Sequence, residues 1–229
     1  MSLFAIGDLH LSLASDKPMD VFGGGWDNYV EKIKEGFSLL GSDDVCVLCG
    51  DLSWGMSLKE SMNDLKFIDA LPGRKIILKG NHDYWWETVT KMKNAFEQNG
   101  IESIEILHNN SFRYGDAAIC GTRGWLLETE ADAAHNAKIV SRETLRLRAS
   151  LESAVDAAEK LCFLHYPPRY NDQVCPEILA AMKDHNVTKC FYGHIHDYGH
   201  RFAVQGNADG IHYSMVSADY LSFVPKKIM

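Results

Sequence analysis

Short apolar runs recur along this 229-residue chain, and most are followed by polar residues that include a glycine. Runs of about four to eight apolar residues bounded by turn-forming residues are typical of buried β-strands. We therefore expect strands at Leu3–Ile6, Val45–Leu48, Lys75–Leu78, Ala117–Cys120, Leu161–Leu164, Lys189–Tyr192 and Ile211–Ser217.

Segments with a helical spacing of apolar residues separate most of these runs. Tyr29, Ile33 and Phe37 recur every four residues, which places them on one face of a helix. Pro72-Gly73 and Gly100 are the stop signals expected after two further helices. The expected helices are Asp27–Leu40, Lys59–Leu71, Trp85–Asn99 and one or two helices over about Asp132–Lys160.

This alternation of strands and helices predicts an α/β layered fold, in which ligands bind where the strands end. The chain has no proline- or serine-rich linker, no low-complexity tract and no repeat of fixed period. With 46% hydrophobic residues, it has enough apolar side chains for one sizeable core. We expect a single domain over residues 1–229.

The charge balance is acidic, with 23 Lys and Arg against 31 Asp and Glu and a net charge of −8. Such a chain repels polyphosphates unless its basic residues are clustered, so general nucleic-acid binding is disfavoured. A small cationic metal site would still attract a single phosphate. No apolar run approaches the ~20 residues that a membrane helix needs, and nothing at the N-terminus resembles an export signal.

The six cysteines do not have the placement of a disulfide framework. Most lie inside apolar runs, where small buried thiols are ordinary core residues. Cys46 and Cys49 form a C-x-x-C pair, but residues three apart in a strand face opposite ways and cannot bind one zinc ion together. Free core cysteines fit a reducing compartment, so we expect a cytoplasmic protein.

Histidine, aspartate and asparagine gather in the polar clusters after the strands. Residues two apart in extended chain point to the same side, so Asp8 with His10, and His194 with His196, can each present two ligand atoms to one site. Turn formation explains one or two such clusters, but not a His, Asp or Asn in each. The candidate ligands are Asp8, His10, Asp51, Asn81, His165, His194 and His196.

These nitrogen and oxygen donors suit Mn, Fe, Zn or similar divalent ions. Seven side chains exceed what one catalytic ion needs, and they suit two ions that share a bridging carboxylate. The clusters Asp8-Leu9-His10, Gly50-Asp51, Gly80-Asn81-His82-Asp83, His165 and Gly193-His194-Ile195-His196 resemble, in order, the five signature blocks of the calcineurin-like metallophosphoesterase superfamily. The residues between the blocks also resemble a group of bacterial predicted phosphohydrolases of unassigned substrate.

The resemblance implies a four-layer α/β/β/α sandwich with the metal site at the strand ends. Asp8, His10 and His196 would bind one ion, and Asp51 would bridge it to a second ion. Asn81, His165 and His194 would bind that second ion. His82 would be the catalytic acid or phosphate donor, oriented by Asp83.

The implied reaction is hydrolysis of a phosphate ester, in which a hydroxide between the ions attacks phosphorus and His82 protonates the leaving oxygen. The segment Gly50–Gly55 lacks the Asp-Arg pair of protein Ser/Thr phosphatases, and Trp54 stands where purple acid phosphatases have a tyrosine. A small phosphorylated substrate is therefore expected. A nuclease-type phosphodiesterase and a non-enzymatic scaffold on the same fold remain alternatives.

Candidate substrate contacts are less sharply indicated. Tyr84 and Trp85 form either a wall of the substrate pocket or ordinary core, and Arg123 and Arg169 are either phosphate clamps or surface residues. The aromatic run favours a small phosphodiester with a flat or apolar leaving group over a monoester. An apolar seam of Leu145, Leu151 and Val155 suggests a possible homodimer.

Overall fold

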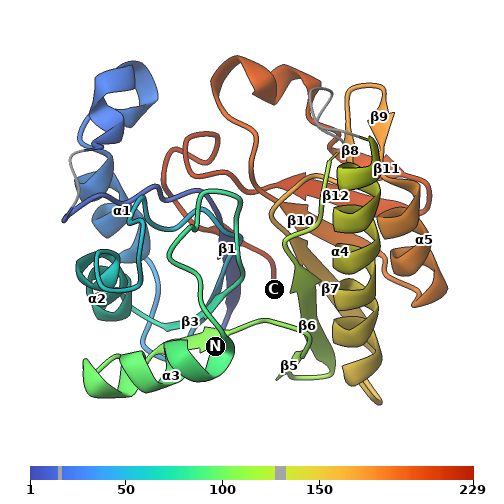
Figure 1. The fold of residues 1–229 in the computed structure, drawn as a ribbon, viewed down its shortest axis with the longest axis horizontal. Coiled ribbons are helices and arrows are strands. Elements are labelled where there is room, and N and C mark those ends of the chain that lie inside the picture. The colour runs from blue at the N-terminus through green and yellow to red at the C-terminus, as the bar shows by residue number, and fades with distance from the viewer. Residues whose placement is uncertain (15–16, 127–132) are drawn as a thin grey trace.

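The computed structural model describes residues 1–14, 17–126 and 133–229. Figure 1 shows helices α1, α2 and α3 on one side of the molecule and α4 and α5 on the other, with the strands between them. The strands form two main sheets and a small separate hairpin of β8 and β9. The hairpin strands are Arg169–Tyr170 and Gln173–Val174.

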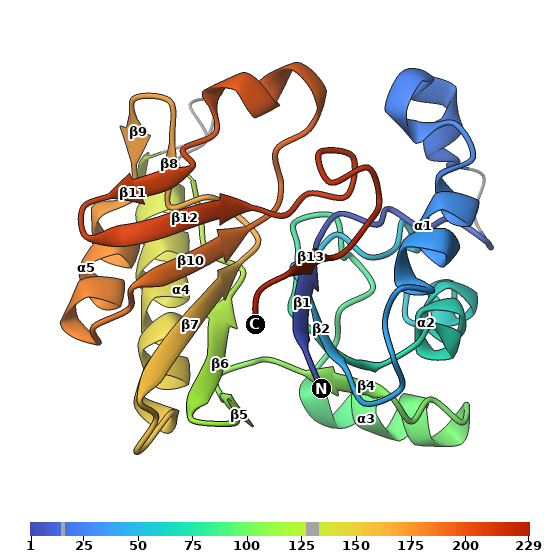
Figure 2. The ribbon, with the colours of Figure 1, turned by 180° about the vertical axis from the view of Figure 1, so that it is seen from behind.

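The first sheet has the strand order β13-β1-β2-β3-β4. Strands β1 to β4 are parallel, and the C-terminal strand β13 runs antiparallel beside β1 at the edge, as Figure 2 shows. The bounds are β1 Leu3–Ile6, β2 Val45–Leu48, β3 Arg74–Ile77, β4 Ile104–Ile106 and β13 Lys226–Lys227.

The second sheet has the order β11-β12-β10-β7-β6-β5. Its four inner strands are parallel, and the edge strands β11 and β5 are antiparallel to their neighbours. The bounds are β5 Phe112–Tyr114, β6 Ala117–Thr122, β7 Glu159–Leu164, β10 Lys189–Tyr192, β11 Gly206–Ala208 and β12 Ile211–Met215.

The helices cover the outer faces of the two sheets. The α-helices are α1 Tyr29–Phe37, α2 Met62–Ala70, α3 Val89–Gln98, α4 Ala133–Ser153 and α5 Pro176–Asp184, and the 3-10 helices are Met19–Phe22, Gly24–Trp26 and Asp197–Phe202. Among the described residues, no helix combines the length and the apolar character needed to span a bilayer.

Three separate groups of buried side chains define the layers. Alternate residues of β1 face opposite ways, so Leu3 and Ala5 lie in the core between the sheets while Ile6 packs against the first helical layer. Cys46 and Cys49 divide in the same way, as expected for residues three apart in a strand. The third core lies between the second sheet and helices α4 and α5. The predicted α/β/β/α sandwich is therefore confirmed.

The differences from the predicted elements have local causes. The strands that the sequence did not indicate, β4, β5, β8, β9, β11 and β13, have only two or three residues each, too few for a periodic pattern. Helix α3 begins at Val89 instead of Trp85, and α4 ends at Ser153 instead of Lys160. The expected helix start at Asp132 lies outside the described residues.

The predicted apolar seam on α4 is wrong in one of its three residues. Leu151 is fully buried in the core under the second sheet, so it cannot contact a second subunit. Leu145 and Val155 are exposed, but Val155 lies beyond the end of the helix. The remaining two positions do not form a continuous helical stripe.

Gly36 tests the packing of α1 against the C-terminal segment. A Cβ at this position would overlap the carbonyl oxygen of Phe223. Helix propensity alone favours alanine over glycine by about 1 kcal/mol. We nevertheless expect Gly36→Ala to lower the free energy of unfolding by about 1–3 kcal/mol in urea titrations, because the two segments must separate.

The matched control is Gly25→Ala, where an added Cβ meets open space. This variant should change the free energy of unfolding by no more than about 0.5 kcal/mol. A stabilising effect of Gly36→Ala would contradict the close packing of α1 against Phe223.

Candidate metal centre

The seven expected ligands meet at the carboxyl ends of strands from both sheets. Those from the first sheet follow β1, β2 and β3, and those from the second follow β7 and β10. Because the inner strands of each sheet are parallel, these loops all begin at the same end of the strands, the carboxyl end. The ligands brought together are Asp8, His10, Asp51, Asn81, His165, His194 and His196.

Asp8, His10 and His196 form one group of converging ligand atoms, all within 4.8 Å of one another. The Nε2 atoms of His10 and His196 are 3.3 Å apart, and Nε2 of His196 is 3.7 Å from Oδ1 of Asp8. Asn81, His165 and His194 form a second group. Oδ1 of Asn81 lies 2.5 Å from Nε2 of His165 and 2.9 Å from Nδ1 of His194.

Asp51 lies between the two groups. Its Oδ2 atom is 3.7 Å from Nε2 of His10 in one group and 3.6 Å from Nε2 of His165 in the other. Asp8 and Asp51 also form, with His165, a further set of atoms close enough to hold an ion. The carboxylates of Asp8 and Asp51 are thus the side chains that connect the groups.

The hydrogen bonds of His165 indicate that this donor set suits a cation. Its Nδ1 lies 3.0 Å from the carbonyl oxygen of Cys49, so Nδ1 carries the proton and donates it. Burial lowers the pKa of His165 to about 3, which leaves Nε2 with a lone pair. That lone pair faces the amide oxygen of Asn81, and two such atoms repel unless a cation lies against both. The residues therefore fit a divalent metal.

The carboxylates give a second reason for the same conclusion. Asp8 and Asp51 are almost completely buried, and desolvation raises the pKa of both above the usual range. The negative charge of Asp51 raises the pKa of Asp8 further. A cation against these oxygens would compensate the lost hydration of both groups.

Asp219, which is not among the residues expected from the sequence, holds His196 in place. Its Oδ1 lies 3.0 Å from Nδ1 of His196, and Oδ2 accepts a 3.0 Å hydrogen bond from the N–H of Asp197. Burial lowers the pKa of His196, but the bond to Asp219 and the charge of Asp8 outweigh burial and raise the pKa to about 9. Asp219 comes soon after the last long strand, β12, so the rule of polar residues at strand ends applies to it too.

The backbone at this site is locally strained. Asp8, His10, Asp51 and His194 all have positive φ angles, between 46° and 73°, in a region that non-glycine residues seldom adopt. Gly80 lies so close to Oδ1 of Asp51 that a Cβ there would overlap it. Strain that several long-range bonds maintain at one place is typical of a functional site.

The structure corrects the expected role of Asp83. Its buried carboxylate accepts hydrogen bonds from the backbone N–H groups of Asp51, Leu52 and Gly80, at 2.7–2.9 Å, and from Nε1 of Trp85 at 2.9 Å. A longer bond of 3.4 Å comes from the N–H of Ser53. His82 is not among its partners, so Asp83 fixes the two ligand loops instead of orienting that imidazole.

His82 is positioned by rings. Its centroid is 4.6 Å from that of Trp54 and 6.0 Å from that of Tyr84, and its side chain makes no hydrogen bond to any described residue. Trp54 also stacks on His10 with centroids 4.9 Å apart. Trp54 is thus an aromatic neighbour of the site that the sequence analysis did not select.

The two expected aromatic contacts have different environments. Tyr84 is exposed and lies beside His82, where a substrate can reach it. Trp85 is only 1% exposed and packs in the core beneath the first sheet, with Nε1 bound to Asp83. The expectation that Trp85 lines a substrate pocket is therefore wrong.

The two candidate arginines also differ. The backbone carbonyl of Arg123 accepts hydrogen bonds from the N–H groups of His165 and Tyr166, which places Arg123 beside the metal centre. Arg169 instead forms an ion pair with Asp209, in the turn between β11 and β12. Among the described residues, no hydrogen bond or ion pair joins Arg169 to a candidate ligand, and its guanidinium is bound to Asp209 instead.

The variant Asp219→Asn tests the role of Asp219. We expect metal affinity, measured by chelator competition at pH 9, to fall about 10–100-fold, as is usual when a carboxylate that orients a ligating histidine is lost. Protons compete with metal for His196 in the wild type, so wild-type affinity should rise with pH towards about 9. Removing the negative charge lowers the pKa of His196, and the variant should reach its plateau at a lower pH.

The control is Asp209→Asn, which removes a carboxylate paired with Arg169 at the sheet edge. Its metal affinity and pH profile should match the wild type. An unchanged affinity in Asp219→Asn would show that His196 does not depend on this hydrogen bond to bind metal.

The variant Asp83→Asn separates a structural role from a catalytic one. Asparagine replaces one carboxylate oxygen by an NH₂ group. That group would face backbone N–H donors that have lost their acceptor, and donors that face one another repel. We expect the free energy of unfolding of the metal-free protein to fall by about 3 kcal/mol in urea titrations. The exposed Asp172→Asn is the control and should be neutral. Lost activity at unchanged stability would instead favour a role through His82.

Comparison with known proteins agrees with this geometry. Residues 1–198 match the calcineurin-like phosphoesterase family. The phosphopantetheinyl hydrolase PptH from Mycobacterium tuberculosis is similar in fold, with a TM-score of 0.59 at 17% identity over 100% of this chain and 95% of that one. A protein of unknown function from Aquifex aeolicus, AQ665, matches with a TM-score of 0.49 at 14% identity over 99% and 95%.

No curated protein matches the sequence. The family match covers far more than half of the chain and includes every one of the seven converging ligands. The four-layer sandwich and the positions of the ligands at the strand ends agree with this family match. The chain belongs to the calcineurin-like phosphoesterase family.

Proposed function

We propose that the protein is a dinuclear-metal-dependent hydrolase of phosphate esters that acts on a small molecule. The observation that carries this proposal is the position of Asp51, with one oxygen near a histidine of each ligand group. A carboxylate in that position is suited to bridging two ions. The family supports metal-dependent hydrolysis, and the proposal adds the number of ions and the roles of the residues.

Each residue has a defined task in this reaction. Asp8, His10 and His196 would hold one ion, Asn81, His165 and His194 would hold the other, and Asp51 would be shared between them. Bound Mn, Fe or Zn ions supply Lewis-acid activation of water and of the phosphoryl group. Asp219 keeps His196 in the tautomer whose Nε2 lone pair faces the site.

His82 is the proton donor to the leaving oxygen in this scheme. Its imidazole stands beside His10, with centroids 5.8 Å apart, at the edge of the ligand cluster. Nδ1 of His82 is buried, so Nε2, which binds no described residue, is the nitrogen that would donate to the substrate. Trp54 and Tyr84 hold the ring without competing for its proton.

The surroundings of Trp54 support an apolar or flat leaving group. A cavity of about 280 Å³ beside Trp54 is lined by Lys17, Met19, Val21 and Phe22. Val21 and Phe22 are more than two-thirds exposed, as is typical of a surface that binds a ligand. We therefore favour a small phosphodiester as substrate. The phosphopantetheinyl hydrolase named above has the same fold, so a phosphopantetheinyl ester belongs in the substrate panel.

We further propose a cytoplasmic location. All six cysteines are buried and free, and the pKa of five of them is raised, chiefly by burial in four and by a contact with Cys190 in Cys162. Such thiols are stable in a reducing compartment.

The two-ion assignment is tested with Asp51→Asn. Metal analysis of the Mn-saturated wild type should give two ions per chain, and chelation should abolish hydrolysis of aryl phosphate mono- and diesters reversibly. Asp51→Asn should weaken the binding of both ions, because it removes the carboxylate that they share. A maximum of one ion per chain in the wild type would rule out the bridging role.

The acid is tested with His82→Ala. This variant should keep both ions but lose roughly 10²–10⁴-fold in kcat, the usual range for a positioned proton donor. The loss should be smaller for esters whose leaving group is already a weak base. His212→Ala is the control, since it removes an exposed imidazole on β12, away from the site, and should leave kcat unchanged. Loss of metal from His82→Ala would make His82 a ligand instead.

A further inference from the structure

A second cavity, of about 350 Å³, lies next to the metal centre. Its wall combines a residue of the loop after β3, the segment after Trp85, the residues after β4, the end of β6 and one side of α4. None of the seven candidate ligands lines it. The residues that matter for its chemistry are Lys79, His108, Arg123, Glu143 and Arg146.

The cavity shares its wall with the metal centre. Lys79 precedes Gly80 and Asn81 on the loop that carries one ligand. The carbonyl oxygen of Arg123 accepts hydrogen bonds of 3.1 and 2.8 Å from the N–H groups of His165 and Tyr166. Lys79 is two residues from the ligand Asn81, and the backbone of Arg123 contacts the ligand His165, so the cavity and the metal centre are neighbouring sites.

The charge of the cavity is positive. Glu143 is fully buried, and its Oε1 atom lies 2.8 Å from Nη1 of Arg146 and 3.4 Å from Nη2 of Arg123. One carboxylate thus faces two guanidinium groups, and the ammonium of Lys79 adds a third cation. Glu87, the other acidic residue of the wall, is paired with Lys91 outside the cavity. The net excess is two positive charges in a chain whose overall charge is −8.

Two of these cations have donors left over. Nε of Arg123 is buried and has no hydrogen-bond partner. Lys79 makes no hydrogen bond or ion pair to any residue that the structure describes. The guanidinium of Arg123 is also fixed, because it lies over the ring of Trp125, 5.1 Å from the centroid, and against Glu143. Fixed donors without acceptors are what a bound anion would satisfy.

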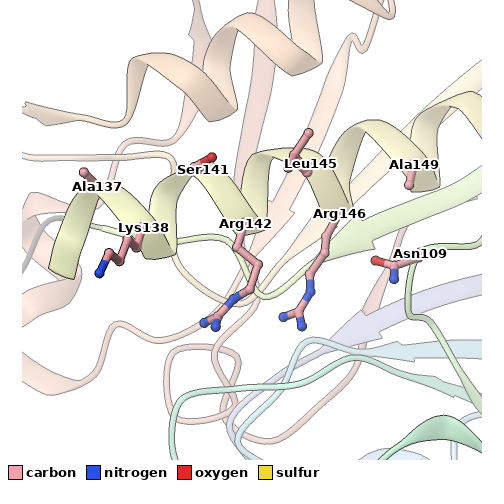
Figure 3. Close-up of a pocket in the computed structure, with 8 residues that line it drawn as sticks. All are labelled: Asn109, Ala137, Lys138, Ser141, Arg142, Leu145, Arg146 and Ala149. Carbon is pink, nitrogen blue, oxygen red and sulfur yellow. The ribbon is translucent and has the colours of Figure 1, made fainter. Parts of the chain in front are cut away.

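Helix α4 presents Arg142 and Arg146 towards this side. Figure 3 shows the side chains of Arg142 and Arg146 leaving α4 in the same direction, away from Leu145. Arg146 belongs both to the wall of the cavity and to the adjoining groove along α4, whereas Arg142 lines the groove alone. Removing Arg146 therefore changes the cavity, and removing Arg142 does not.

We propose that this cavity binds a second anionic group of the substrate, a phosphate, while the scissile phosphate lies at the metal centre. The assignment rests on the proposed function and names its substrate class: small molecules that carry two phosphoryl groups. Lys79, Arg123 and Arg146 contact the second phosphate, and Glu143 keeps the two arginines in place without cancelling their charge. The volume is within the usual range of small-ligand sites.

A series of bisphosphates tests the proposal without assuming the distance between the two sites. The substrates are alkanediol bisphosphates of increasing chain length, each compared with the matching alkyl monophosphate. At one length the bisphosphate should have a KM about tenfold lower than the monophosphate, the effect of one or two charge-assisted hydrogen bonds. Lys79→Met and Arg146→Gln should each remove most of this advantage and leave kcat for the monophosphate within about twofold.

The matched control is Arg142→Gln, which removes a guanidinium from the same helix, 3.7 Å from Glu143 but outside the cavity. This variant should keep the full lowering of KM for the bisphosphate relative to the monophosphate. Lys79→Met breaks no ion pair, so it also serves if Arg146→Gln fails to fold. The proposal is overturned if no chain length gives an advantage, or if the advantage persists in both cavity variants.

A binding measurement separates this proposal from the proposed function. Inorganic phosphate is titrated calorimetrically into the chelator-treated full-length protein, with circular dichroism to show that the fold is retained. Affinity that falls about tenfold in Lys79→Met and Arg146→Gln but not in Arg142→Gln supports the anion site even if no ester is hydrolysed. Phosphate binding without any bisphosphate advantage would make the cavity a site for free anions and overturn its assignment to substrate.

Discussion

The geometry of the metal centre depends on the hydrogen bonds that the buried carboxylate of Asp83 accepts. It accepts hydrogen bonds from N–H groups of the loop after β2 and of the loop after β3, so one buried charge joins the two. The loop after β2 is joined in turn to the loop after β1, because the N–H groups of Asp8 and His10 donate to the carbonyls of Gly50 and Asp51. These hydrogen bonds fix the positions of the three ligand loops relative to one another. They also stabilise the left-handed backbone conformations of the ligand residues, which are unfavourable for residues other than glycine.

The other half of the centre comes from the second sheet, and the contact between the sheets completes it. The N–H of Gly7, after β1, donates to the carbonyl of Val216 after β12, and the carbonyl of Gly7 accepts from Ala218. Asp8 accepts two hydrogen bonds, of 3.0 and 2.9 Å, from the N–H of His194. A metal bound here would therefore connect the two halves of the sandwich and add to its stability by mass action, as any ligand specific to the folded state does.

The site residues that the sequence predicted are those whose positions depend on local sequence, and the ones it did not predict depend on contacts between distant segments. The ligands were predictable because each lies within four residues of the carboxyl end of a parallel strand, where the loops of such a sheet meet. The left-handed backbone at Asp8, His10 and His194 shows that their side chains converge through turns, and not through the extended spacing that the sequence suggested. Asp83 and Trp85 lie beside the third block, but the sequence gives no direction for their side chains, and both turn into the core. Trp54 and Asp219 act across contacts between distant segments, His196 and Asp219 being 23 residues apart, and no local pattern indicates such partners. Arg169 followed the rule of strand ends, yet its nearest anion was Asp209, 40 residues away.

The distribution of charge connects the fold to the choice of substrate. A net charge of −8 repels a long polyanion, whose many phosphates would meet the acidic surface wherever they extended beyond the site. A small molecule would meet only the region where cations exceed anions, namely the proposed metal site and the wall formed by Lys79, Arg123 and Arg146. The carboxylate of Glu143 offsets one of these positive charges, and the three basic side chains still outnumber it. The same arrangement that disfavours nucleic acid therefore favours a compact substrate with few phosphates.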